Sequence, residues 1–228
     1  MKSGAIIVAA GEGRRMGGRD KLFYTLGGSP LLVLTLKAFQ QHPGIDAIVL
    51  VGGERVRKEF GEKWKEGYGF SKVIAAVAGG PLRQDSVYNG LRAFPSPPDL
   101  VLIHDGDRPF IPRSVISAVL KEAAGGGALA AVAVKDTVKR VDGEGVIVDT
   151  PSRRELRLAQ TPQGFPFALI LAAHERARRE GWEVTDDAAL AERAGVRVRV
   201  VEGSYDNIKV TTPEDLALAE AIHSRRDR

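Results

Sequence analysis

Five short runs of aliphatic residues most constrain how this chain can fold, because they are continuous rather than alternating. They are rich in Val, Ile, Leu and Ala and occupy residues 5–10, 47–51, 73–77, 100–103 and 128–134. A strand with one face in water alternates apolar and polar residues, whereas a strand covered on both faces is apolar throughout. We therefore expect buried strands in a sheet that carries helices on both faces.

The segments between and after these runs have helical spacing. Apolar residues recur at intervals of three and four, and Ser29-Pro30 is expected to start the first helix with Ser as its cap. Strands that alternate with helices predict an α/β fold with a mostly parallel, open sheet flanked by helices. The expected helices are 30–38, 83–94, 112–124, 166–180, 186–194 and a last one after Thr212, with a further strand at 196–201.

A different pattern occupies residues 135–158. Two strand-like stretches, 137–141 and 146–150, flank the turn sequence Asp142-Gly143-Glu144-Gly145, which predicts a β-hairpin arm. An isolated hairpin is marginally stable in water, so we expect the arm to pack on something else, and a partner subunit is one candidate. With 228 residues, the chain is expected to form a single domain, 1–228, that carries this arm.

Composition excludes several classes of function. The chain has no cysteine, which excludes a disulfide scaffold, a thiolate zinc site and a cysteine nucleophile. Its longest apolar run is far shorter than the roughly 20 residues that cross a bilayer, and no signal-peptide pattern is present, so we expect a cytoplasmic protein without membrane contact. The net charge of +4 is too small to indicate nucleic acid but suits an acidic small molecule.

The first apolar run ends in a glycine-rich, basic segment. Ala9-Ala10-Gly11-Glu12-Gly13-Arg14-Arg15-Met16-Gly17 is followed closely by Lys21. Glycines let the backbone approach a ligand, and clustered N–H groups with basic side chains bind phosphates. The spacing matches neither the P-loop nor the Gly-x-Gly-x-x-Gly pattern. Because ligands of open α/β sheets bind at the carboxyl ends of strands, we predict a phosphate-binding loop here rather than an ordinary flexible turn.

Two further loops are expected at the same edge of the sheet. Asp105 and Asp107 follow the fourth run, and two carboxylates separated by one residue can hold Mg²⁺ when phosphates supply the remaining oxygens. An ion pair from Asp107 to Arg108, or a helix cap, is the alternative. His104 is expected to be a packed residue rather than a general base. Gly79-Gly80 follows the third run, so three loops are expected to form one pocket.

Polar residues of the second half have weaker patterns. Thr185 precedes a helix and is expected to act as its N-cap. Lys209 lies within a strand-like run just before the last helix, where a lysine is usually solvated. In residues 160–165, the polar side chains of Gln160, Thr161 and Gln163 lie among apolar residues in the sequence.

In their order along the chain, these motifs resemble the 2-C-methyl-D-erythritol 4-phosphate cytidylyltransferase family of the non-mevalonate isoprenoid pathway. The resemblance spans nearly the whole chain, and Thr161-Pro162-Gln163 and Asp206–Thr211 are its most specific parts. The other matching segments are 9–16, Lys21, 83–87, His104-Asp105, Arg108-Pro109, 135–139, Thr185-Asp186 and Pro213–Asp215.

The resemblance implies a fold, a reaction and a set of residue roles. The fold is of the nucleotide-diphospho-sugar transferase (Rossmann-like) type, in a homodimer joined through the arms. The substrates are CTP and methylerythritol phosphate with Mg²⁺, and the products are CDP-methylerythritol and pyrophosphate. The implied catalytic residues are Arg15, Lys21 and Lys209; the nucleotide-binding residues are Ala9, Ala10, Gly11, Gly13, Gly80, Ser86 and Asp105; the acceptor-binding residues are Arg108, Thr137, Arg153, Thr161 and Thr185; and the expected metal ligands are Asp105 and Asp107.

Two positions depart from the pattern of the family. Gly106-Asp107 stands where two alanines are usual, which adds a carboxylate beside the expected metal, and Pro81 stands where an acidic residue is common. Proline has no N–H to donate to a nucleotide base. Three other functions remain open at this point: a pentitol (ribitol) phosphate cytidylyltransferase, a metal-dependent glycosyltransferase that uses Asp105 and Asp107, and a nucleotide-binding regulatory module without turnover.

Overall fold

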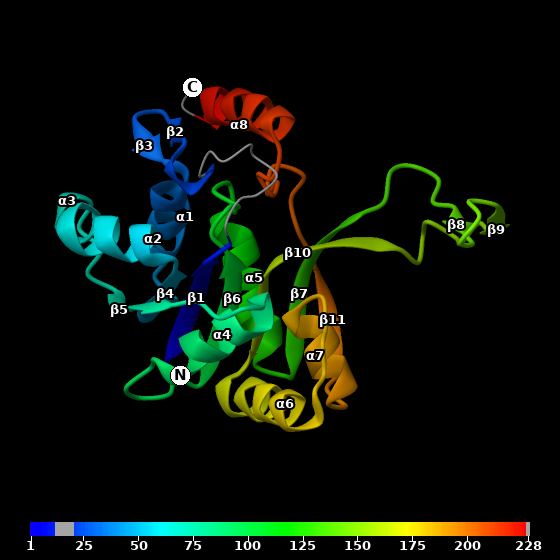
Figure 1. The fold of residues 1–228 in the computed structure, drawn as a ribbon, viewed down its shortest axis with the longest axis horizontal. Coiled ribbons are helices and arrows are strands. Elements are labelled where there is room, and N and C mark those ends of the chain that lie inside the picture. The colour runs from blue at the N-terminus through cyan, green and yellow to red at the C-terminus, as the bar shows by residue number, and fades with distance from the viewer. Residues whose placement is uncertain (12–20, 227–228) are drawn as a thin grey trace.

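A seven-stranded sheet forms the centre of the protein (Figure 1). The computed structural model describes residues 1–11 and 21–226. Strand β10 is antiparallel to both of its neighbours, and the other pairings in the sheet are parallel. The predicted mostly parallel, open α/β sheet is therefore confirmed. In spatial order the strands are β11 (Val198–Glu202), β7 (Gly127–Ala133), β10 (Arg157–Pro166), β6 (Leu100–Asp105), β1 (Ser3–Ala9), β4 (Ala47–Gly52) and β5 (Val73–Ala78).

Helices cover both faces of the sheet, which explains why the strand sequences are continuously apolar. Along β1, Ala5 and Ile7 belong to one hydrophobic core and Ile6 belongs to the other. The first core contains side chains of α1 (Leu31–Gln40) and α5 (Arg113–Ala123). The second contains side chains of α4 (Arg83–Arg92), α6 (Phe167–Glu180) and α7 (Asp187–Arg193). Both faces of the central strands are thus removed from water.

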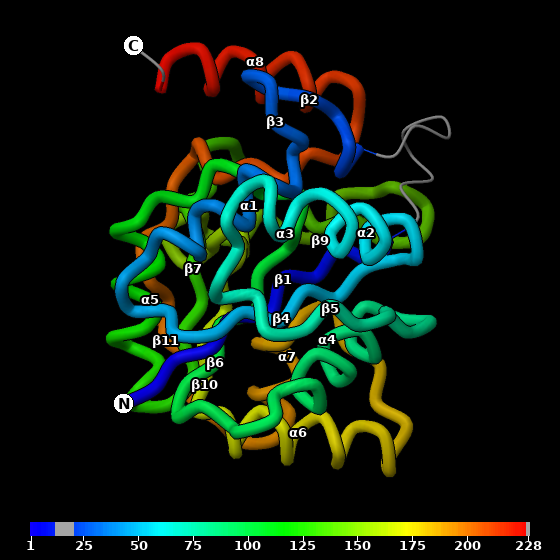
Figure 2. The backbone as a smooth tube through the Cα atoms, turned by 90° about the vertical axis from the view of Figure 1, so that its left-hand side faces the viewer, coloured from blue at the N-terminus to red at the C-terminus, as the bar shows by residue number. Residues whose placement is uncertain are grey.

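Smaller elements surround this framework. The chain between β4 and β5 forms α2 (Glu54–Glu59), a π-helical turn (Phe60–Trp64) and α3 (Lys65–Gly67). The 3-10 turn Lys21–Phe23 leads into the short hairpin of β2 (Thr25–Leu26) and β3 (Ser29–Pro30). This hairpin and α8 (Pro213–Arg226) lie at one end of the molecule, opposite α6 (Figure 2). Across the parts of the chain that the structure covers, no helix has the length and apolar character needed to span a membrane.

Two predicted helix caps were wrong. Ser29 does not cap α1, because Ser29-Pro30 pairs with Thr25-Leu26 as a strand and α1 begins without a side-chain cap. Thr185 does not cap α7; the cap is Asp186, whose carboxylate accepts the N–H of Ala189 at 2.8 Å. Asp186 has the extended backbone of a cap residue, so its own short carboxylate reaches the free N–H groups of the first turn.

Strand β10 was not predicted from the sequence. Its middle, Gln160-Thr161-Pro162-Gln163, is polar and contains a proline, and both features usually argue against a central strand. The register of β10 against β7 shifts between Ala159 and Gln163. The polar side chains in this irregular part are buried and hydrogen-bonded to the body of the protein.

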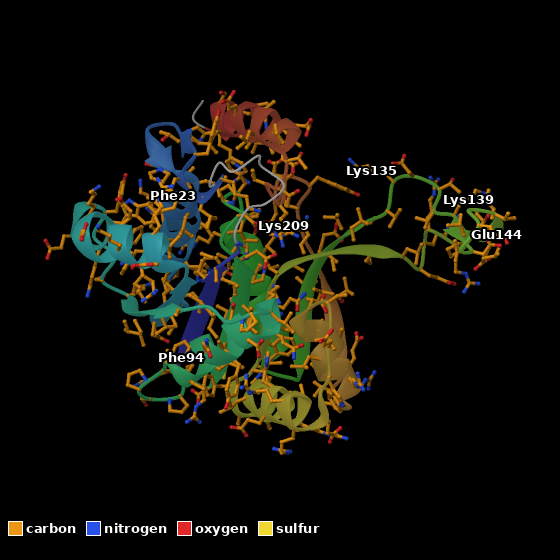
Figure 3. All side chains as sticks on the ribbon, in the orientation of Figure 1. Phe23, Phe94, Lys135, Lys139, Glu144 and Lys209 are labelled. Atoms are coloured by element: carbon orange, nitrogen blue, oxygen red, sulfur yellow. The ribbon has the colours of Figure 1, made fainter. Side chains whose placement is uncertain are left out.

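The predicted hairpin arm is confirmed as a projection beyond the end of the sheet (Figure 1). Its antiparallel ladder, β8 (Arg140–Val141) with β9 (Ile147–Asp149), is shorter than expected from the sequence. Asp142 closes the turn by accepting the N–H groups of Glu144 and Val146. Glu144 lies near the far end of the arm (Figure 3). Near the turn of the arm, four aliphatic residues are each more than half exposed: Val141, Val146, Ile147 and Val148.

Candidate active site

A cavity of about 580 Å³ lies where the carboxyl ends of β1 and β6 meet the loop after β5. The three loops expected to converge do so, because all three contribute to its wall. Most of the residues with predicted nucleotide or metal contacts line it, namely Ala9, Ala10, Gly11, Lys21, Gly80, Ser86, Asp105, Asp107 and Lys209. Gly13 and Arg15 lie outside the described residues.

The loop after β5 fits closely against the end of β1. A Cβ atom on Gly79 would lie 2.2 Å from the Cβ of Ala10, so only glycine permits this approach. The hydroxyl of Ser86 accepts the N–H of Gly80 at 3.0 Å and donates to the carbonyl of Leu82 at 3.2 Å. Ser86 therefore shapes the loop that carries Gly80, and the backbone here forms one wall of the cavity.

Asp105 is the electrostatic centre of the cavity. Its Oδ2 accepts from Lys209 Nζ at 2.9 Å, and its Oδ1 accepts from Arg83 Nε at 3.2 Å. Arg108 adds a third positive charge, with Nε 3.6 Å from Oδ2. Burial alone would raise the pKa of the Asp105 carboxyl, but the three cations outweigh it and hold the pKa well below its usual range. Figure 3 shows Lys209 between the sheet and the base of the arm.

Asp107 contacts Lys21 rather than Arg108. The Oδ2 atom of Asp107 is 2.5 Å from Lys21 Nζ, and both side chains are nearly buried. The other oxygen, Oδ1, is buried and has no hydrogen-bond partner among residues 1–11 and 21–226. The two alternatives to metal binding were wrong, because Arg108 pairs with Asp105 and the next helix, α5, begins at Arg113 without a side-chain cap. Metal binding by Asp107 stays a prediction.

His104 is a packed, neutral residue, as expected. Its Nε2 lies 3.1 Å from the carbonyl of Arg108 and its Nδ1 lies 3.0 Å from the hydroxyl of Thr161. These partners assign the proton to Nε2, with Thr161 donating to Nδ1. Burial lowers the pKa of His104 to about 4. The Thr161 hydroxyl also accepts the N–H of Asp105 at 3.0 Å, so it holds the strand end that bears the central carboxylate.

Folding stability should depend on pH through His104. The unfolded chain binds a proton there near pH 6.5, but the folded chain binds it only near pH 4. The stability contributed by neutral His104 is therefore fully present above pH 6.5 and is lost as the pH falls toward 4, by about 3 kcal/mol. The free energy of unfolding is measured with urea at several pH values, without Mg²⁺, for the wild type and for His104→Asn. Equal acid sensitivity of the two proteins would contradict the prediction.

The residues predicted to bind the acceptor are not gathered at the cavity of one chain. Thr137 and Arg153 are exposed on the arm, where Arg153 donates to the carbonyl of Lys135 at 2.8 Å. Thr185 is exposed before α7. Arg108 lies behind Asp105 and donates to the carbonyl of Asn207 at 2.8 Å. Of this group, Arg108 and Thr161 contact the Asp105 end of the cavity, whereas Thr137, Arg153 and Thr185 are absent from its wall.

Two residues of the site were missed by sequence reasoning. Arg83 lines the cavity and binds Asp105, and it is held from behind by Asp187, whose Oδ2 accepts from Arg83 Nη1 at 2.7 Å. The sequence does contain a hint of this pair. Arg83 directly follows the third glycine-bearing loop, and Asp187 precedes the apolar Ala188–Leu190 and is buried with it.

Comparisons with known proteins agree with this geometry. The sequence profile of the 2-C-methyl-D-erythritol 4-phosphate cytidylyltransferase family matches residues 4–225. The protein of that name from Desulforamulus reducens is 48% identical over 225 residues, which cover 98% of this chain and 96% of the relative.

Solved structures show the same relationship. The 4-diphosphocytidyl-2C-methyl-D-erythritol synthase of Anaerococcus prevotii aligns with a TM-score of 0.87 at 33% identity, covering 98% of this chain and 96% of that one. The 2-C-methyl-D-erythritol 4-phosphate cytidylyltransferase of Thermus thermophilus aligns with a TM-score of 0.77 at 37% identity, covering 98% and 100%. This chain therefore belongs to the 2-C-methyl-D-erythritol 4-phosphate cytidylyltransferase family.

Proposed function

We propose that this protein transfers CMP from CTP to 2-C-methyl-D-erythritol 4-phosphate and releases pyrophosphate. The observation that carries the proposal is a cluster of cations, Lys21, Arg83 and Lys209, held by Asp107 and Asp105 in one cavity of a chain that belongs to this family. In this reaction an oxygen of the acceptor phosphate attacks the α-phosphorus of CTP, and the bond to the pyrophosphate oxygen breaks. The attacking oxygen is already anionic, so no protein nucleophile is needed.

What the reaction requires is alignment and charge neutralisation. Lys21 is held by Asp107 and Lys209 is held by Asp105, so both ammonium groups are in place before a substrate enters. Preorganised charges stabilise a transition state without the cost of turning dipoles during the reaction. In our proposal Lys21, with Arg15, binds the triphosphate, and Lys209 faces the phosphorus where negative charge accumulates. The backbone around Gly80 would bind the cytosine.

The carboxylates of the cavity fit a requirement for Mg²⁺. Asp107 Oδ1 is buried and accepts no hydrogen bond from the part of the chain that the structure describes, and carboxylate oxygen is the ligand that Mg²⁺ prefers. Each oxygen of Asp105 accepts a hydrogen bond from a cation, and each carboxylate oxygen keeps a further lone pair that could bind a metal ion. Within residues 1–11 and 21–226, no cluster of three or more His, Asp or Glu could hold a metal by itself. We therefore propose that Asp107, with Asp105, would hold Mg²⁺ together with substrate phosphates, whose negative charge the ion would partly neutralise.

The arm supports a homodimer in which each site is shared. Val141, Val146, Ile147 and Val148 expose aliphatic surface on a hairpin that has no core of its own, which favours burial against a second copy. In our proposal, Thr137 and Arg153 reach the acceptor in the site of the neighbouring subunit, since neither lines the cavity of its own chain. A reaction that uses CTP also suits the cytoplasmic location expected from the sequence.

Release of pyrophosphate tests the proposed reaction. The four common nucleoside triphosphates are each incubated with Mg²⁺ and either methylerythritol 4-phosphate or ribitol 5-phosphate. We expect rapid release only with CTP and methylerythritol 4-phosphate. Faster turnover of ribitol phosphate would establish the pentitol alternative, and transfer from a nucleotide sugar without pyrophosphate would establish the glycosyltransferase. CTP binding without turnover of any acceptor would indicate a regulatory module.

The proposed metal role of Asp107 predicts a shift in the dependence of the rate on Mg²⁺. Asp107→Ala should raise the Mg²⁺ concentration for half-maximal rate, with a smaller effect at saturating metal, because mass action offsets the lost affinity. Asp107→Asn keeps one carbonyl oxygen and should raise this Mg²⁺ concentration less. Titration of Mg²⁺ is compared with melting curves of the same proteins. A fall in melting temperature or in saturating rate without a shift along the Mg²⁺ axis would contradict metal binding by Asp107.

A further inference from the structure

A chain of buried polar contacts runs from the cavity into the second core. Arg83, the first residue of α4, donates from Nε to Asp105 Oδ1 at 3.2 Å and from Nη1 to Asp187 Oδ2 at 2.7 Å. One guanidinium therefore bridges two carboxylates from different elements, β6 and α7. Lysine could not make this bridge in the same way, because its single ammonium lacks the planar fork of arginine.

Asp187 is enclosed on the side away from Arg83. It is 1% exposed, and its second oxygen lies 3.2 Å from Nε2 of His174, which is 2% exposed. Both carboxylate oxygens of Asp187 thus have a partner, and neither faces the cavity. Burial alone would raise the pKa of Asp187, but Arg83 and His174 reverse this effect and lower the pKa, so the carboxylate stays charged at neutral pH.

Strand β10 places both carboxylates relative to each other. Thr161 accepts the N–H of Asp105, and two residues further on Gln163 binds the beginning of α7. The side chain of Gln163 accepts the N–H of Ala188 at 2.8 Å and donates to Asp186 at 2.9 Å. The Thr161-Pro162-Gln163 segment therefore connects the end of β6 with the start of α7, and Arg83 spans the interval between them.

We propose that Asp187 is a positioning residue for the reaction and acts through Arg83. Arg83 lines the cavity, and its two carboxylate contacts leave further N–H groups that can donate to an anionic phosphate of the nucleotide. The carboxylate of Asp187 neutralises part of the positive charge of Arg83 and fixes its orientation. Without it, Arg83 turns to Asp105 alone and competes there with Lys209. This inference rests on the proposed function, because the phosphate it concerns is that of CTP.

A matched pair of substitutions separates this role from a general effect on α7. Asp187→Asn keeps the shape of the side chain but removes its charge, and we expect kcat to fall about tenfold, as for other contacts within one hydrogen-bond network. Glu192→Gln, the control, removes one carboxylate charge from an exposed position of the same helix, α7. The contacts of Arg83 among the described residues are with Asp105 and Asp187 and do not include Glu192, so the kinetics of this variant should stay near those of the wild type.

A double-mutant cycle with Arg83→Lys then decides whether the effect passes through Arg83. Two quantities are measured: kcat with CTP and methylerythritol phosphate, and the affinity for CTP by calorimetry. In the Arg83→Lys background, Asp187→Asn should lower both much less than it does in the wild type. Equal losses in both backgrounds, accompanied by a lower melting temperature, would show a merely structural role and overturn the proposal. Wild-type kinetics of the Asp187→Asn single variant would overturn it as well.

A second variant keeps the test decisive if Asp187→Asn does not fold. His174→Gln retains a side-chain N–H that can donate to Asp187. His174→Gln should lower kcat less than Asp187→Asn does, and this loss of kcat should also disappear in the Arg83→Lys background. If kcat still falls in that background, the proposal is contradicted. If the wild type binds CTP but releases no pyrophosphate, the proposed function fails, whereas the affinity cycle still tests the coupling of Asp187 to Arg83.

Discussion

Replacing Lys21 with alanine is expected to lower kcat by about two decades or more. Lys21 lines the cavity, nearly buried, and its ammonium is fixed by Asp107. Removal of one preorganised charge at a transition state costs on the order of 3 kcal/mol, which corresponds to this loss of rate. Steady-state kinetics at saturating CTP and acceptor measure the effect, and circular dichroism shows whether the fold is retained.

Two further variants interpret that result. Lys63→Ala removes an exposed lysine that pairs with Glu59 on the surface, and its rate should match the wild type. Lys21→Ala also leaves the Asp107 carboxylate without its cation, so Lys21→Ala combined with Asp107→Ala should regain melting temperature without regaining rate. Unchanged turnover of Lys21→Ala itself would place this lysine outside the reaction.

Mixing two inactive variants is expected to restore activity through hybrid dimers. Lys21→Ala damages the cavity of its own chain, and Arg153→Ala removes a group on the exposed arm. In a hybrid of two-fold symmetry, one site loses both groups and the other retains both. With random exchange, half of the dimers are hybrids and half of their sites are intact, so about a quarter of the wild-type rate should return. Pyrophosphate release is followed as the two proteins exchange subunits.

The complementation needs its own controls. Each variant alone must be inactive at the same total concentration, and exchange is verified with differently tagged subunits. Arg140→Ala in place of Arg153→Ala tests whether any loss of charge on the arm has the same effect, since Arg140 forms an exposed pair with Asp149. If hybrids form and no rate returns, the shared site is refuted.

The architecture and the location of the cavity were predictable from the sequence. Continuous apolar runs of this length favour strands that are covered on both faces, as the central strands are, although Ile74 on the edge strand β5 is 46% exposed, contrary to the expectation for residues 73–77. Such strands in alternation with helices form a mostly parallel sheet. The carboxyl ends of its strands are then one edge, so loops that follow Ala9, Ala78 and Asp105 must meet there. Local pattern and topology are sufficient for this level of description.

Strand β10 and its register were not predictable in the same way. Gln160 and Gln163 are polar and Pro162 cannot donate an N–H, so local preference argued against a central strand. Burial was possible only because Ser204, Asn207 and Ala188, all distant in the sequence, supply hydrogen-bond partners. Partners of this kind exist only once the chain has folded.

The pairing of charged side chains was likewise predictable only in part. The sequence by itself determined which charged residues follow the strands and that they gather at one edge, because strand order and residue type are local properties. Only the tertiary structure decided that Lys21 pairs with Asp107, that Asp105 holds Lys209 and Arg83, and that the buried Asp187 supports Arg83 from behind. The physical reason is that a buried charge requires a partner within a few ångströms, and the pairs chosen here lie 22 to 104 residues apart in the chain.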